Sequence, residues 1–264
     1  MFLVRLLAGE MYLMIYITGD CHADFRRFNK KYFPEQLEMT KDDFVIICGD
    51  FGGVWNKDIE SKHEKVQLDW LESQPFTTLF VSGNHENYDR LDAYPVEVWN
   101  GGKIQRIRPS VIHLMRGQIY TIDGKKIFSF GGASSQDISG GILELDDPLY
   151  KEKKKELDRE YISYRVNHLS WWERELPTME EMIEGKRNLE KHNNEVDFIV
   201  THCCAASTQV LINTCYSKID CLTKYFEELR QTIKFKKWFF GHYHENKNVT
   251  AEEILIYEQI IRIN

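Results

Sequence analysis

Six short apolar runs recur along the chain, and each is rich in β-branched or aromatic residues. In each run the apolar residues give way to glycine, aspartate, asparagine or histidine. The runs occupy residues 13–20, 44–50, 78–85, 127–133, 198–202 and 237–242. Runs of this length and composition, bounded by turn-forming residues, predict buried strands.

Two stretches between these strands have helical periodicity. Residues 57–73 place apolar or semi-polar side chains at helical spacing. Residues 178–193 open with Thr178 and Glu181, which match the capping box found at the start of many helices. Strands that alternate with helices in this way predict a layered α/β domain.

Antiparallel pairing is predicted in two places. Residues 111–132 and 252–264 alternate apolar and polar positions or turn on the dipeptide Asp123 and Gly124. Such patterns are typical of a hairpin, so part of the sheet should be antiparallel hairpin. The chain has no internal repeat and no linker composition, so residues 11–264 are expected to form one domain.

Residues 134–172 differ from the rest of the chain, because they combine a run of mixed charge, two adjacent glycines and two adjacent tryptophans. The simplest interpretation is a solvated surface helix, followed by aromatic side chains that fasten it to the body. Because the segment directly follows a strand end, the alternative is an insertion that forms a lid over a site. Residues 1–10 are either an upstream start or a short N-terminal extension.

Length and composition are those of an ordinary globular protein. The chain has 264 residues, of which 42% are hydrophobic and 28% charged. A chain of this size can bury roughly 70 to 75% of its unfolded surface. The formal net charge of -7 argues against a protein that coats nucleic-acid phosphates without specificity. An anionic substrate could still be received by a local basic groove or by metal ions.

The cysteines show no paired CxxC spacing; they lie at positions 21, 48, 203, 204, 215 and 221. Cys48 lies within an apolar run, where a small buried thiol is expected. These features predict reduced thiols and a cytoplasmic location. The opening residues are apolar, but Glu10 interrupts them and no uncharged span reaches about 18 residues, so no membrane anchor is expected.

Side chains able to bind metals follow five of the six predicted strands. The motifs are GDCH at residues 19–22, GDFGG at 49–53, GNHE at 83–86, TH at 201–202 and GHYH at 241–244. Ligands gather at the carboxyl ends of strands in open α/β sheets, because the loops there bring distant residues together. The candidate residues at these strand ends are Asp20, His22, Asp50, Asn84, His85, His202, His242 and His244.

Each motif alone also fits a structural role in a turn, a helix cap or a satisfied polar group, and the flanking Trp55, Tyr88 and Tyr243 are expected to be packing residues. Five coincident strand ends favour a site. Alternate residues of an extended segment point to the same side, so His242 and His244 are expected to present both imidazoles on one face. Oxygen donors with imidazole nitrogens, and no cysteine, suit Mn²⁺, Fe²⁺ or Zn²⁺.

Taken in order, the five motifs resemble the five blocks of the calcineurin-like metallophosphoesterases. The resemblance implies an α/β fold, a four-layer α/β/β/α sandwich of two mixed β-sheets flanked by helices. It also implies two divalent metal ions, with Asp20, His22 and His244 binding one, Asn84, His202 and His242 binding the other, and Asp50 bridging both. His85 would then donate a proton to the leaving oxygen or stabilise charge in the transition state.

The expected function is hydrolysis of phosphate esters, either diesters or monoesters, by a water that bridges the two ions. The expected substrate is a small phosphate ester or a nucleotide. The alternatives are a metal-dependent nuclease and a non-catalytic scaffold on the same fold. The presence of His85 beside Asn84 favours an enzyme, and the oligomeric state is left open.

Two positions depart from the protein serine/threonine phosphatases of this superfamily. Those enzymes extend the second block with an aspartate that orients the catalytic histidine and an arginine that binds phosphate, whereas this chain has Gly53 and Val54. An equivalent partner for His85 must therefore come from elsewhere. The stretches FSFGGASSQD and SWWERELPT are instead similar to small bacterial and phage metallophosphoesterases. Arg159 and Arg165 could reach a phosphate, but each is expected to be exposed.

Overall fold

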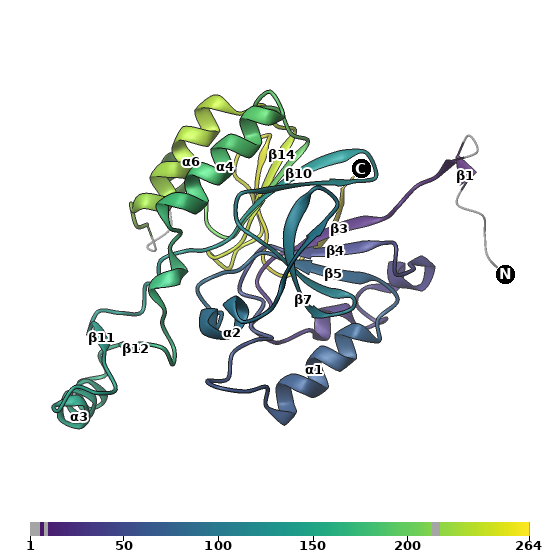
Figure 1. The fold of residues 1–264 in the computed structure, drawn as a ribbon. Coiled ribbons are helices and arrows are strands. Elements are labelled where there is room, and N and C mark those ends of the chain that lie inside the picture. The colour runs from purple at the N-terminus through teal and green to yellow at the C-terminus, as the bar shows by residue number, and fades with distance from the viewer. Residues whose placement is uncertain (1–5, 8–9, 213–216, 264) are drawn as a thin grey trace.

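Two β-sheets form the centre of the molecule (Figure 1). The structure is a computed structural model that describes residues 6–7, 10–212 and 217–263. The first sheet has the strand order β17-β3-β4-β5-β8-β7-β6, and the second has the order β15-β16-β14-β13-β10-β9. The first comprises β3 (Ile15–Thr18), β4 (Phe44–Ile47), β5 (Thr77–Phe80), β6 (Val96–Trp99), β7 (Gly102–Arg108), β8 (Val111–Leu114) and β17 (Ile260–Ile263). The second comprises β9 (Gln118–Ile122), β10 (Lys125–Phe130), β13 (Phe198–Thr201), β14 (Lys237–Phe240), β15 (Lys247–Asn248) and β16 (Glu253–Leu255).

Helices and two small ladders complete the described chain. The α-helices are α1 (Lys62–Glu72), α2 (Tyr88–Asp92), α3 (Tyr150–Glu160), α4 (Met179–Lys191), α5 (Ala206–Ile212) and α6 (Cys221–Thr232). The 3₁₀ helices are η1 (Arg26–Phe28), η2 (Pro34–Glu38) and η3 (Glu173–Glu175). The small ladders pair β1 (Leu6–Leu7) with β2 (Glu10–Met11) and β11 (Ile142–Leu143) with β12 (Arg165–Val166).

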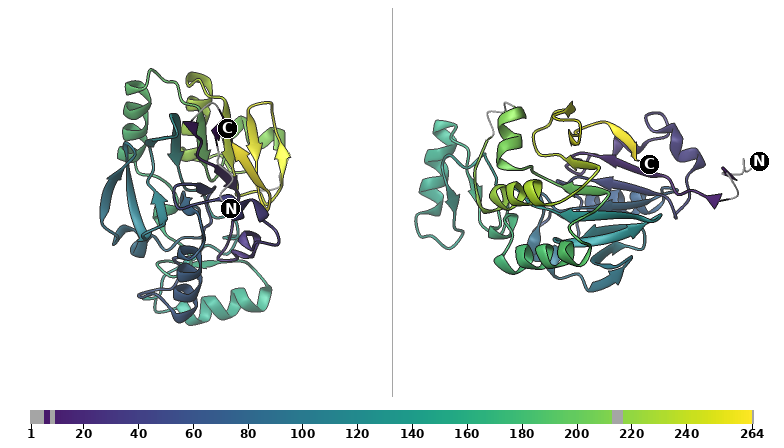
Figure 2. Two further views of the ribbon diagram at one scale, coloured as in Figure 1. Left: turned by 90° about the vertical axis from the view of Figure 1, so that its right-hand side faces the viewer. Right: turned by 90° about the horizontal axis from the view of Figure 1, so that it is seen from above.

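The two sheets pack face to face, and helices cover their outer faces (Figure 2). Alternation along β3 builds these layers, because successive side chains of a strand point to opposite faces. Ile15 and Ile17 enter the apolar cluster between the sheets, whereas Tyr16 enters the cluster that also holds Leu68 of α1. The outer face of the second sheet packs against α4, α5 and α6, as Phe226 illustrates. The predicted α/β/β/α sandwich is confirmed.

Both predicted helices are present, and their capping residues explain where they begin. Thr178 and Glu181 form the predicted capping box at the start of α4. The predicted start of the other helix, at residue 57, is wrong, because Ser61 and Glu64 form a capping box at the start of α1. Glu64 also accepts hydrogen bonds from two backbone N–H groups of the preceding loop, which holds that loop in a turn.

The hairpin predicted at Asp123 and Gly124 joins β9 to β10, and both turn residues have positive φ. The carboxyl-terminal stretch behaves differently. β16 pairs within the second sheet, whereas β17 pairs antiparallel with β3 in the first sheet. The predicted antiparallel pairing in residues 252–264 is confirmed, since β16 pairs antiparallel with β15 and β17 with β3. The stretch does not fold back on itself as a hairpin, because the chain crosses from one sheet to the other there.

An arm, residues 138–166, projects from the body and carries β11, α3 and β12 (Figure 1). No residue of α3 is buried, as predicted for a solvated helix. After the arm the chain returns to the body at Trp172, which is 1% exposed and donates from Nε1 to Asp89 at 2.7 Å. This contact matches the prediction that the aromatic side chains attach the segment to the body of the protein.

None of the helices in the described part of the chain is long and apolar enough to cross a bilayer. The cysteines at 21, 48, 203 and 204 are buried free thiols, and Cys221 is an exposed one. Cys215 lies outside the described residues, as do most of residues 1–10. The prediction of a buried thiol at Cys48 is confirmed.

Candidate metal centre

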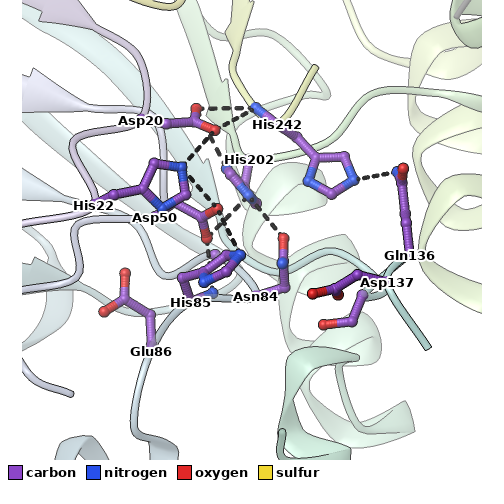
Figure 3. Close-up of polar contacts among 12 residues, drawn as sticks. Asp20, His22, Asp50, Asn84, His85, Glu86, Gln136, Asp137, His202 and His242 are labelled. Atoms are coloured by element: carbon purple, nitrogen blue, oxygen red, sulfur yellow. Dashed lines mark hydrogen bonds and ion pairs between the residues drawn. The ribbon is translucent and has the colours of Figure 1, made fainter. Parts of the chain in front are cut away.

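Five strand ends from the two sheets meet at one edge of the sandwich. β3, β4 and β5 run parallel in the first sheet, and β13 and β14 run parallel in the second. The loop after each of these strands carries one of the five polar motifs. As a result His22 and His244, which are 222 positions apart, lie in contact. Figure 3 shows six of the seven predicted metal ligands at this edge, and His244 lies there with Asp20, His22 and Asp50.

One group of donor atoms surrounds the carboxylates of Asp20 and Asp50. The donor atoms of Asp20, His22, Asp50 and His244 all lie within 4.8 Å of one another. His244 Nε2 is 3.1 Å from Asp20 Oδ2, and His22 Nε2 is 3.7 Å from Asp50 Oδ2. Both carboxylates are buried, at 1% and 2% exposed. The three residues predicted to bind one ion therefore lie together with the predicted bridge.

A second group lies on the other side of Asp50. His202 Nε2 is 3.2 Å from Asp50 Oδ1 and 3.2 Å from Asn84 Oδ1. The other nitrogen of His202 faces a backbone carbonyl at 2.8 Å, which fixes the orientation of the ring. The His242 ring packs edge-on against His202 with centroids 4.9 Å apart, and its Nε2 contacts Gln136 at 2.8 Å (Figure 3). Asp50 is shared by both groups.

The backbone of this site is left-handed at several residues that are not glycine. The φ angle is 47° at His22, 44° at Asp50, 71° at His242 and 50° at His244. Such conformations cost about 1 to 3 kcal/mol each and concentrate at functional sites. The expectation that His242 and His244 share one face of an extended segment is wrong, because the chain turns at both residues. The two imidazoles instead enter different groups of donor atoms.

Two glycines leave the space that the carboxylates occupy. A Cβ atom at Gly83 would lie 2.0 Å from Asp50 Oδ1, and one at Gly241 would lie 2.0 Å from Asp20 Oδ1. Both oxygens also accept a backbone N–H from the same two loops, at 2.8 and 2.9 Å. Asp50 is therefore held in place by the loop after the adjacent strand β5, and Asp20 by the loop after β14 of the other sheet.

The electrostatic field of the centre favours positive charge. Burial opposes ionisation of Asp50, but the imidazoles of His202, His85 and His22 outweigh burial and hold the pKa of this carboxyl well below its usual range. Burial likewise disfavours the charged form of His202, yet Asp50 and Asp20 outweigh it and raise the pKa of His202 to about 9. The two buried carboxylates thus create a negative potential that would stabilise a bound cation.

His85 lies beside this centre, with Nε2 4.0 Å from Asp50 Oδ2. Burial lowers the pKa of its imidazole to about 4. The ring of Trp55 stacks on His85 with centroids 5.7 Å apart, and Trp172 packs edge-on against Trp55. Trp55 is a packing residue, as expected, but it packs on the candidate catalytic residue itself.

The expectation that Arg165 is exposed is wrong. Arg165 is 5% exposed, its Nη2 donates to His85 Nε2 at 3.0 Å, and its Nε donates to Asp137 Oδ1 at 2.8 Å. The pairing of β12 with β11 at the base of the arm places it there. Arg159, by contrast, has a side chain that is 72% exposed, as predicted.

Two further residues complete the site and escaped prediction. Gln136 follows β10, which runs parallel to β13, so the rule about strand ends applied to a sixth strand would have found it. Glu86 is fully buried and accepts from the backbone N–H of Phe51 at 2.7 Å. It ties the loop after β5 to the loop after β4, a role that only the structure reveals.

Two cavities meet at His85. The larger, about 840 Å³, opens on the metal centre and is lined by Asn84, His85 and His242 together with Arg165 and residues 135–139 at the base of the arm. The smaller, about 310 Å³, reaches His85 from the side of α1 and is lined by Trp55. The centre is thus accessible from two directions.

The residues present fit divalent metal ions, because buried carboxylate and amide oxygens lie among imidazole nitrogens around one shared carboxylate. Together with the four-layer sandwich, this arrangement defines the class as the metal-dependent phosphoesterases. The chain belongs to the calcineurin-like phosphoesterases, since the model of that family matches residues 13–246.

The curated relatives that match are lariat debranching enzymes. The enzyme A of Xenopus laevis is 25% identical over 145 residues, which cover 50% of this chain and 26% of that protein. The Arabidopsis thaliana enzyme is 33% identical over 102 residues, 34% of this chain and 23% of that protein. The chain thus spans about a quarter of the length of these relatives. Among solved structures, phosphopantetheinyl hydrolase of Mycobacterium tuberculosis matches with a TM-score of 0.44 and 14% identity, over 95% of each chain.

Proposed function

We propose that this protein hydrolyses phosphate esters with the help of two divalent metal ions, one in each group of donor atoms. The observation that carries the proposal is the convergence of oxygen and imidazole donors around Asp50. The ions would be Mn²⁺, Fe²⁺ or Zn²⁺. When bound, such ions activate water for attack on phosphorus and polarise a phosphoryl oxygen.

Each donor has a role in this proposal: Asp20, His22 and His244 hold one ion, Asn84, His202 and His242 hold the other, and Asp50 lies between them. Asp50 suits the shared position because its oxygens face different groups, Oδ1 at 3.2 Å from His202 and Oδ2 at 3.7 Å from His22. His85, which lines both cavities, donates a proton to the leaving oxygen or stabilises charge there.

The two cavities support a phosphate diester as the substrate. A phosphate bound beside His85 has an open space of about 840 Å³ on one side and about 310 Å³ on the other. A monoester has one organic substituent and would fill only one of them. Trp55 lines the smaller cavity, so a flat group of a nucleotide could pack against its side chain.

A metal-dependent nuclease is the second candidate. The curated relatives are named for debranching lariats. A third cavity of about 650 Å³ shares Ser135, Ile138 and Lys218 with the large cavity, which would extend the path available to a longer substrate. The net charge of -7 disfavours broad contact with phosphates, so such a substrate would be neutralised by the metal ions. A non-catalytic scaffold would not need His85.

In the same proposal, residues 11–264 form one phosphoesterase domain, and residues 134–172 are an insertion whose base borders the large cavity. The buried thiols fit a reducing compartment, in support of a cytoplasmic location.

The test replaces the shared carboxylate. Asp50→Asn should abolish hydrolysis of an activated aryl phosphate diester in added Mn²⁺ and should reduce the metal content of the purified protein, which is expected near two equivalents. Asp24→Asn, which changes an exposed aspartate close to the same site, is the matched control and should retain activity.

A panel of bis-aryl phosphate, mono-aryl phosphate, cyclic nucleotide and oligonucleotide separates the candidates. Faster hydrolysis of the bis-aryl ester than of the mono-aryl ester supports the diester assignment, and preference for the oligonucleotide supports the nuclease. Full activity of Asp50→Asn would refute the metal-bridging role. Absence of hydrolysis of every substrate by the metal-loaded wild type would favour the scaffold.

A further inference from the structure

A buried cation faces the large cavity from the arm. Arg165 is 5% exposed and lines the cavity with Asn84, His85 and His242. Its position is unusual because the remainder of the metal centre comes from loops that follow strands of the two main sheets, whereas Arg165 lies in the small ladder of the arm. A buried charge is costly unless it is paired, so its partners indicate what the residue is for.

Three hydrogen bonds hold the guanidinium in place, and they do not use all of its N–H donors. Its Nε donates to Asp137 Oδ1 and its Nη1 donates to the carbonyl of Ser170, each at 2.8 Å, while Nη2 donates to His85 Nε2 at 3.0 Å. A guanidinium has five N–H donors, so these three bonds within the described chain leave donors for a ligand. The side chain of Asp137 is 54% exposed and balances the charge only in part.

Gly53 and Val54 are the positions of the second block that could supply a cation, but the packing there leaves no room for a charged side chain. Val54 is fully buried in the apolar cluster beneath α1, and a Cβ atom at Gly53 would lie 2.4 Å from the ring of Phe51. Lys218 also lines the large cavity, but it is exposed. Arg165 is therefore the buried cation that the described chain offers next to His85.

We propose that Arg165 is the phosphate-binding residue of this site, with its guanidinium donating to a non-bridging oxygen of the scissile phosphate beside His85 and with Asp137 holding it in position. The inference rests on the proposed phosphoesterase function and deepens it. A planar guanidinium matches two phosphate oxygens, and bonds of this kind are about twice as strong as those between neutral groups. The arm thus contributes directly to the site, so substrate binding depends on the pairing of β11 with β12.

The experiment measures binding of inorganic phosphate to the metal-loaded protein by calorimetry, together with kcat and KM for an aryl phosphate diester. Arg165→Met should weaken phosphate binding and lower kcat/KM by about tenfold to a hundredfold, the usual range for a lost hydrogen bond to a charged group. Arg165→Lys should recover part of this lost affinity, because lysine keeps the positive charge but lacks the planar guanidinium that can bond two phosphate oxygens at once. Asp137→Asn should give a smaller loss, mostly in KM.

Arg159→Met is the matched control, since Arg159 is an exposed arginine of the same arm. It should bind phosphate and turn over substrate like the wild type. Because Arg165 also bonds the Ser170 carbonyl, folding is monitored by circular dichroism, and the rise in Tm that phosphate causes is measured for each variant.

Wild-type phosphate affinity in folded Arg165→Met would overturn the proposal, even if its Tm without phosphate is lower, because an arginine with only a structural role would give that result. If Asp50→Asn is inactive while both Arg165 variants act like the wild type, the phosphoesterase function stands and the role of Arg165 fails. If Asp50→Asn remains fully active, the function proposed for the metal centre fails first.

Discussion

Glu175 is a buried carboxyl close to the site, and its replacement by glutamine should stabilise the protein at neutral and alkaline pH. The side chain is 1% exposed and accepts two hydrogen bonds from Ser135, from the backbone N–H and from the hydroxyl, each at 2.9 Å. Burial outweighs these bonds and raises the pKa of Glu175 from 4.5 to about 8. Glutamine has the same shape and can bond both groups of Ser135 without carrying a charge.

The direction and size of the effect follow from linkage between protonation and folding. Below pH 4.5 the carboxyl is neutral in both states, so it causes no difference. As the pH rises from 4.5 to about 8, the unfolded chain releases a proton that the folded chain retains, and stability is lost. The loss should be about 1 kcal/mol at about pH 5 and about 4 kcal/mol at about pH 8. Glu175→Gln should abolish this loss of stability, because glutamine does not ionise.

Urea unfolding followed by tryptophan fluorescence, with a chelator present to remove metal ions, measures this difference. The gain in free energy of unfolding of Glu175→Gln over the wild type should grow by about 3 kcal/mol between about pH 5 and about pH 8. Glu173→Gln is the control, since Glu173 is exposed on the same 3₁₀ helix, and its effect should be equal at both pH values. A constant difference for Glu175→Gln, or a loss of stability at about pH 8, would refute the reasoning.

Two other predictions concern features that the sequence and the structure both identify. Thr178→Ala removes the side-chain oxygen that accepts the backbone N–H of Glu181 at 3.2 Å, so it should lower the free energy of unfolding by about 1 kcal/mol. Thr178→Ser keeps the hydroxyl and should be nearly neutral. Unchanged stability of the alanine variant in urea would contradict the role of Thr178 as a helix cap. Gly241→Ala places a methyl group 2.0 Å from Asp20 Oδ1, so metal content measured by atomic spectroscopy should fall and turnover with it. Gly124→Asn, at an open turn where asparagine tolerates a φ of 71°, should keep its metal, and equal metal content in the two variants would count against Asp20 as a ligand.

Much of the fold could be predicted from local patterns. The apolar runs became β3, β4, β5, β10, β13 and β14. The capping box at Thr178 and the turn at Asp123 and Gly124 also lie where the sequence predicted them. These features succeed because the residues that cause them are within a few positions of one another. The donor residues at the strand ends could also be predicted from the sequence, because parallel strands bring their carboxyl ends to one edge of a sheet.

The sequence alone could not assign partners across long separations. β17 follows β16 closely in the chain but pairs with β3 in the other sheet, because the two sheets face each other and the chain can cross between them. The left-handed turns at His242 and His244 split a histidine pair that spacing alone would keep on one face.

By itself, the sequence determined which residues are chemically able to bind metals and where six core strands and the helices α1 and α4 lie, since periodicity and capping act over a few residues. Only the tertiary structure decided that Arg165 is buried against His85 and not exposed, and that Glu86 and Trp55 belong to the site. The physical reason is that burial and contact depend on how the sheets, the arm and their loops pack together, and no local spacing specifies that packing.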